Sequence, residues 1–156
     1  MKSKLLLNTY DGSLTACTIR PQSEDTQVEF SVQYYRHENG EERSVSAILR
    51  FSQVASIDVE INFFDNPIGA ELGGFYEILD RDFKMQMLEK VFQNRKDGYL
   101  FHGDYDYDPK EPGDILNFRP PIEGVLGEVE QYRLFQQQTQ GGIYHILCKR
   151  YELIEG

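Results

Sequence analysis

Long apolar segments are absent from this sequence. The longest run near the N-terminus is Leu5-Leu6-Leu7. A membrane-spanning helix needs roughly 20 apolar residues, and the apolar centre of a secretion signal needs about 7 to 15. The sequence therefore predicts a cytoplasmic protein that does not enter a membrane.

Cysteines and basic residues are also few. The 2 cysteines, Cys17 and Cys148, lie far apart and belong to no CxxC or Cys/His motif, so we expect reduced thiols that pack as small apolar side chains in strands. Lys and Arg number 16 against 26 Asp and Glu, a formal charge of −10. A nucleic-acid binder needs a basic surface, so nucleic acid is excluded as a partner.

What the sequence does contain is enough apolar material for a core. Its 156 residues are 40% hydrophobic and 13% aromatic, which is too rich for intrinsic disorder despite the negative charge. The length fits one unit, so a single globular domain is predicted over residues 1–156.

Two alternating segments on either side of Asn39-Gly40 predict a β-hairpin. Asn-Gly is the pair best suited to the positive φ values of a type I′ turn. A two-residue loop there pairs apolar with apolar residues: Tyr34 with Val45, Val32 with Ala47, Phe30 with Leu49, and Val28 with Phe51. A shift by one residue would break all four pairs. The other face pairs Glu29 with Arg50, an ion pair that contributes about 0.2–1 kcal/mol.

Further alternation extends this hairpin into a sheet. Ile57, Val59 and Ile61 share one face, which predicts a third strand after a short connection at Val54-Ala55, and hence a three-stranded meander over residues 27–64. Asp11-Gly12 predicts an opening hairpin between strands at 5–9 and 14–20.

One more strand is predicted after the meander, and a second hairpin near the C-terminus. Residues 68–74 are predicted as a loop and 75–79 as a strand. A second hairpin, with residues 139–142 as its loop, sets Leu134 opposite Leu147 and Phe135 opposite Ile146. Both faces of this pair are apolar, so we expect it to be buried on both sides.

One main α-helix is predicted over residues 82–96. Its apolar residues recur on a single face, and Gly98 supplies a C-terminal stop. The residues on that face are Phe83, Met87, Leu88, Val91 and Phe92. The predicted fold class is thus α+β: a predominantly antiparallel sheet of hairpins and meander, with this helix packed on it. Tyr99–His102 is predicted as the strand that follows.

The segment after the helix carries the residues most suggestive of a site. In an extended chain His102, Asp104, Asp106 and Asp108 lie on one face, and Tyr105 and Tyr107 on the other. The EF-hand pattern fails here, because Pro109 stands where the loop needs Gly and Ile115 where it needs Glu. A facial triad of the non-haem iron type does fit the spacing of His102, Asp104 and His145. The competing interpretation is a solvated strand edge whose charges prevent edge-to-edge pairing.

Three functions are weighed on this basis. The first is a non-enzymatic interaction module for a basic protein, with no catalytic residue and no cofactor, because a charge of −10 attracts a cationic surface. Its predicted binding residues are Tyr99, Asp104, Tyr105, Asp106, Tyr107 and Asp108. The second is a metal-dependent enzyme that uses His102, Asp104 and His145. The third is a carrier of a small ligand held between sheet and helix. The oligomeric state is left open.

Overall fold

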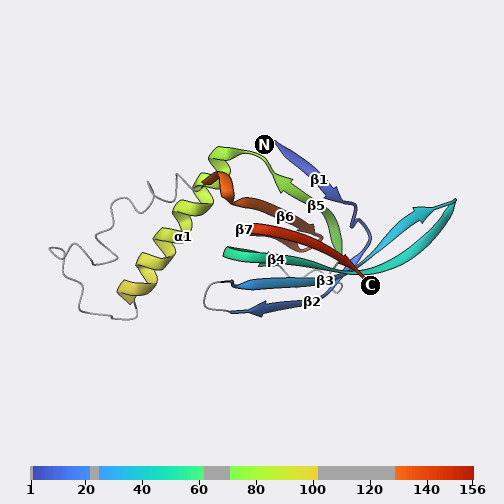
Figure 1. Ribbon diagram of the computed structural model, residues 1–156, viewed down its shortest axis with the longest axis horizontal. Helices are drawn as coiled ribbons and strands as arrows, with labels where there is room; N and C mark the ends of the chain where they lie inside the picture. Colours follow the sequence, from blue (N-terminus) through green and yellow to red (C-terminus); the bar gives the residue numbers. More distant parts are fainter. Residues whose placement is uncertain (1, 22–24, 62–70, 102–128) are drawn as a thin grey trace. The chain divides into compact units, whose positions relative to one another are not determined.

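The fold is built on a seven-stranded antiparallel sheet. The computed structural model describes residues 2–21, 25–61, 71–101 and 129–156, with backbone alone for 92–101 and 129. The strands are β1 (Ser3–Leu7), β2 (Ser13–Arg20), β3 (Gln27–Glu38), β4 (Glu41–Ile61), β5 (Leu72–Ile78), β6 (Arg133–Thr139) and β7 (Gly142–Glu155). Their order across the sheet is β1-β5-β6-β7-β4-β3-β2 (Figure 1). The predicted α+β class, with a mostly antiparallel sheet and one main helix, is confirmed.

Two compact units can be distinguished along the chain. One contains the sheet, in residues 1–80 and 132–156, and the other spans residues 81–131. The second unit holds α1 (Arg81–Phe101) and the 3₁₀ turn η2 (Val129–Gln131), which an ion pair between Arg81 and Glu130 connects at 3.0 Å. The packing of the helix on the sheet and the single domain stay predictions.

The β3–β4 hairpin has the predicted register throughout. Tyr34 pairs with Val45 and Val28 with Phe51, and the turn residues Asn39 and Gly40 have φ values of 53° and 78°, as a type I′ turn requires. The β2 and β7 partners reach only as far as Gln33 and Ala47, so the tip of this hairpin extends beyond its neighbours as a two-stranded ribbon (Figure 1).

Replacing Gly40 by Val should therefore weaken the fold through backbone strain alone. A Cβ at Gly40 would meet nothing within 4 Å, but a β-branched residue at a φ of 78° is strained by about 1–3 kcal/mol. Urea denaturation of the Gly40→Val variant should show that loss. An unchanged midpoint would contradict the type I′ turn.

The predicted meander is wrong, because β4 does not turn back at Val54-Ala55. It continues to Ile61, and its second half pairs with β7, from Val54 opposite Cys148 to Ile61 opposite Gly142. Gln53 adopts a left-handed φ of 52°, and the register shifts between Val54 and Ser56. Such a bulge bends a strand without ending it. The one-residue shift in the alternation of apolar and polar residues therefore marks a bend in β4 and not a loop.

The predicted opening hairpin is also wrong. Strands form in both segments, but β1 pairs with β5 and β2 with β3, so they occupy opposite edges of the sheet. The turn between them, closed by a bond from the Gly12 amide to the Thr9 carbonyl, lies against the start of β5, where the Leu72 amide donates to the Gly12 carbonyl at 2.9 Å. The turn at Asp11-Gly12 therefore lies where the chain passes from one edge of the sheet to the other.

The C-terminal hairpin is confirmed on both of its faces. Leu134 lies opposite Leu147, and Phe135 opposite Ile146, and all four residues are fully buried. Phe135 and Ile146 belong to the main core cluster, which also draws on β3, β4 and β5. The predicted burial on two sides is therefore correct.

The main core is rich in aromatic rings. Phe51 lies at its centre, with ring centroids 5.4 Å from Phe135, 5.5 Å from Tyr151 and 6.0 Å from Phe75. These rings come from β4, β6, β7 and β5, strands that are far apart in the chain. Offset and edge-to-face contacts at such distances add to the stabilisation that burial gives.

Two predicted boundaries near the helix need correction. α1 runs through Gly98 to Phe101, so residues 99–101 are helical and not a strand; a glycine inside a helix costs only about 1 kcal/mol relative to Ala. Strand β5 begins at Leu72, within the segment predicted as a loop.

Met87 and Leu88 are the buried side chains described on α1. Within the described residues, no helix combines the length and apolar character needed to cross a membrane.

Candidate functional site

Most of the predicted site residues lie outside the described part of the chain. His102 and the acidic run (Asp104, Tyr105, Asp106, Tyr107 and Asp108) belong to this group, and Tyr99 is described only as a helical backbone position in α1. His145 lies in β7, opposite Asp58 of β4 and Gln136 of β6. The described residues contain no group of three His, Cys, Asp or Glu suited to a metal ion. The partner surface and the metal triad stay predictions.

Both cysteines lie in strands, as expected, and neither is in a disulfide. The expected packing is correct for Cys148, which is buried in β7, and wrong for Cys17, which is exposed on β2. Burial raises the pKa of the Cys148 thiol to about 12, and partial burial also raises the pKa of Cys17. A thiol with a raised pKa is a poor nucleophile at neutral pH.

A polar cleft in the sheet unit is the strongest candidate site in the described part. It has a volume of about 470 Å³. Its lining comes from β3, β4, β6 and β7 and from one residue that lies two positions before β3. We call it the basic cleft, and it is lined by Asp25, Gln27, Arg50, Ser52, Arg133, Lys149, Arg150, Tyr151 and Glu152. These residues are distant in sequence, and the β4–β7 and β6–β7 pairings bring them together.

The backbone at the cleft is irregular. Gln53 has a left-handed φ of 52°, and its amide donates to the Asp25 carboxylate at 2.8 Å. The next amide, of Val54, donates to the Thr26 carbonyl at 3.1 Å. These two bonds hold the chain before β3 against the bulge of β4. Left-handed backbone in a residue other than glycine is costly and recurs at binding sites.

Carboxylates hold two of the arginines in fixed orientations. Arg133 donates from Nε and Nη2 to both oxygens of Glu77, at 2.8 and 2.9 Å, and this bond to Glu77 raises the pKa of the guanidinium. Arg50 donates from Nε to Glu29 at 3.3 Å. The side chains of Glu29 and Glu77 are only 10% and 15% exposed, and neither lines the cleft. They hold the arginines from outside the cleft lining.

The lining itself is positively charged. It carries four cationic side chains, Arg50, Arg133, Lys149 and Arg150, and two carboxylates, Asp25 and Glu152, so 4 − 2 leaves +2. Glu152 lies 3.8 Å from Arg50, and Asp25 lies 3.8 Å from Arg150. Guanidinium groups in fixed positions bind oxyanions through paired hydrogen bonds. Chemically, such an arrangement can bind an anion.

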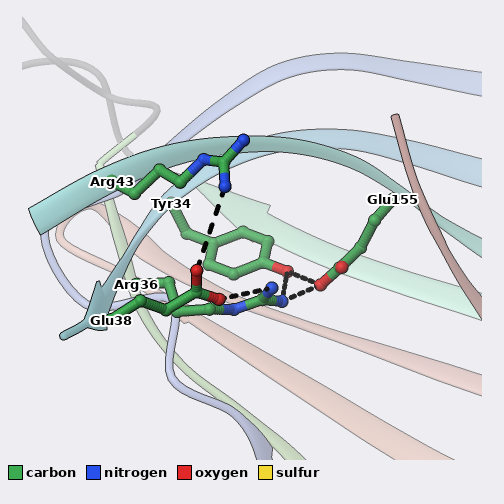
Figure 2. Close-up of polar contacts among 5 residues, drawn as sticks. All are labelled: Tyr34, Arg36, Glu38, Arg43 and Glu155. Carbon is green, nitrogen blue, oxygen red and sulfur yellow. Dashed lines mark hydrogen bonds and ion pairs between the residues drawn. The ribbon is translucent and has the colours of Figure 1, made fainter.

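A second polar cluster lies at the base of the hairpin ribbon and has a structural role. Figure 2 shows Tyr34 and Arg36 of β3 both pointing at Glu155 of β7. The Tyr34 hydroxyl donates to Glu155 at 2.6 Å, and Arg36 donates to the same oxygen. Burial is the main cause that raises the pKa of Tyr34 to about 12, and the bond to Glu155 adds to it. The bonds from Tyr34 and Arg36 lower the pKa of Glu155. The contacts join β3 to the end of β7 across the intervening β4.

Comparison of the chain with protein-family models, with curated proteins and with solved structures finds no match. The function of the basic cleft must therefore be argued from the chemistry of its own residues.

Sequence reasoning found one contact of the cleft and missed the rest. The Glu29–Arg50 pair was predicted from the hairpin register and is confirmed. Lys149-Arg150, two adjacent charges that interrupt an apolar strand, are the sequence signal of this cleft. The C-terminal register places Arg133 opposite Cys148, next to these charges. What sequence did not show was the pairing of β4 with β7, which sets Ser52 opposite Arg150.

Proposed function

We propose that this protein is a non-enzymatic binding protein and that the basic cleft receives an anionic ligand. The observation that carries the proposal is the meeting of four cationic side chains in one cleft of a chain whose formal charge is −10. All four residues line one cleft, where Glu29 and Glu77 orient Arg50 and Arg133 from outside the lining.

The chemistry of the lining favours binding over catalysis. A general acid or base works best with a pKa near the working pH, whereas burial raises the pKa of Tyr151 to about 12. The arginines stay protonated throughout the physiological range. The described cleft thus offers hydrogen-bond donors and charge. This makes the small-ligand carrier the closest of the three sequence-based hypotheses, with the cleft as its polar anchor.

Thermal denaturation tests this proposal. A ligand that binds only the folded state raises the melting temperature, because it stabilises that state by a free energy that grows with the logarithm of one plus the ratio of ligand concentration to Kd. Small organic anions, at constant ionic strength, should raise the melting temperature of the wild type. They should not raise that of the Lys149→Met/Arg150→Gln double variant. The matched control is Arg43→Gln, which removes a 75% exposed arginine on the hairpin ribbon and should respond like the wild type. An equal rise in the double variant would refute the proposal.

The net charge of −10 supports a second proposal, a surface for a basic protein in residues 97–114. Six carboxylates and a single lysine in this segment would attract a cationic partner, with Tyr99, Tyr105 and Tyr107 as apolar contacts. Changing Asp104, Asp106 and Asp108 to Asn should weaken binding, mainly through a slower and less salt-sensitive association rate, and leave thermal stability equal or higher. Unchanged capture of basic partners by the triple variant would contradict it. A metal site would instead show itself as a cation-dependent rise in wild-type melting temperature alone.

A further inference from the structure

We infer that the ligand of the basic cleft carries a phosphomonoester dianion on a small organic molecule. The inference rests on the proposed function, since it names the chemical class of the anion that the cleft receives. Three features support it: the number and orientation of the donors, the charge of the ligand opposite four cationic residues, and the room beside the aromatic residue Tyr151.

The donors suit an anion with three terminal oxygens. A guanidinium has five N–H donors in a rigid plane. The bonds of Arg133 to Glu77 use Nε and Nη2, so its Nη1 edge stays available for a ligand. Arg50 is held through Nε by Glu29, while Lys149 and Arg150 contribute to the lining from β7. A carboxylate has two oxygens and satisfies one such fork. A phosphomonoester has three and can bridge several of these cations at once.

The charge of the ligand adds to this preference. Four cationic residues line the cleft together with two carboxylates, and Glu29 and Glu77 pair with Arg50 and Arg133 from outside the lining. The attraction for a ligand therefore comes from bonds to individual cations and not from a net positive charge. A phosphomonoester at neutral pH carries about −1.5 to −2, whereas a carboxylate or a sulfate ester carries a single charge. Charge-assisted bonds are about twice as strong as neutral ones, so the more highly charged phosphomonoester should bind most tightly.

The cleft has space and one aromatic residue for the organic part of such a ligand. Its volume of about 470 Å³ falls within the range of roughly 300–1,000 Å³ that is usual for small-molecule sites and exceeds the need of a lone phosphate. Tyr151 lines it, with its ring stacked on Phe51 of the core at 5.5 Å. A ring that is packed in this way offers a rigid surface at little entropic cost.

Three ligands with the same phenyl ring separate the possibilities: phenyl phosphate, phenyl sulfate and benzoate. They differ in charge and in the number of terminal oxygens. Their affinities would be measured by isothermal titration calorimetry on the full chain at about pH 7.5, where the phosphate is largely a dianion. We expect phenyl phosphate to bind at least about tenfold more tightly than either of the others. Lys149→Met/Arg150→Gln should lose this preference, and the distant Arg43→Gln should keep it.

The outcomes distinguish this inference from the proposed function. Equal binding of benzoate and phenyl phosphate would overturn the phosphate assignment and leave the anion-binding cleft standing. Binding of none of the three, together with no response to other small anions, would overturn both. Phosphotyrosine within a short neutral peptide serves as a fourth arm. Much tighter binding of this peptide than of phenyl phosphate would place the phosphate on a protein and contradict the small-molecule source.

Discussion

Phe51→Ala is expected to cost about 3–5 kcal/mol of stability, the usual range for removing a buried aromatic ring. Phe51 is fully buried, and its ring contacts those of Phe30, Phe75, Phe135 and Tyr151. These four neighbours come from four other strands. Because rigid rings refill a cavity poorly, the cost should lie towards the upper end.

Urea denaturation followed by circular dichroism measures this loss. The control is Tyr35→Ala, on the opposite face of the same hairpin, where the side chain is 42% exposed and the expected change is within about 0.5 kcal/mol. Losses of similar size in the two variants would show that Phe51 is not at the centre of the core.

Gly142→Ala should destabilise the protein by about 3 kcal/mol, at the top of the usual range for overpacking. Gly142 begins β7 and lies opposite Ile61, at the last described pair of the β4–β7 ladder. A Cβ there would collide with the carbonyl oxygen of Glu60 and approach the Ile61 backbone to 3.0 Å. Since those atoms are backbone, the strands themselves would have to separate.

The comparison with Gly40 isolates the cause. Gly40 has open space and a left-handed φ, so Ala is disfavoured there by its conformation, whereas at Gly142 it is disfavoured by lack of space. Thermal denaturation of Gly40→Ala and Gly142→Ala should therefore show the larger loss at Gly142. If Gly142→Ala melts like the wild type, the end of β4 does not pair with β7 as described.

The local parts of the fold could be predicted from the sequence. Both hairpins follow from alternation and from the turn residues, because partners a few residues from a turn are fixed by the turn itself. The pairing of β4 with β7 joins segments about 100 residues apart, and no turn relates them. The bulge at Gln53 also interrupts the alternation, and in the sequence such a change of phase looks the same as a short loop. The hairpin predicted at Asp11-Gly12 was wrong for a related reason: the residues form a turn, but a turn does not require the strands on either side of it to pair with each other.

The candidate site was less predictable than the fold for the same physical reason. The sequence indicated a site only where charged residues lie close together along the chain, as do Asp104, Asp106 and Asp108, and these lie outside the described residues. The basic cleft has cations from β4, β6 and β7, and only tertiary pairing brings them together. The ion pair between Arg50 and Glu29 could be predicted because both residues belong to one hairpin. Arg133 and Glu77 belong to β6 and β5, and their adjacency depends on the strand order.

Chemical-shift mapping tests the central claim, that the basic cleft is where this protein binds its ligand. Phenyl phosphate would be titrated into the ¹⁵N-labelled full chain. We expect the amide and arginine side-chain signals of residues 25–27, 50–53, 133 and 149–152 to shift together with one binding constant, while those of Asn39 and Gly40 at the hairpin tip stay fixed. Saturable shifts confined to residues away from the cleft, or no saturable shifts at all, would contradict the claim.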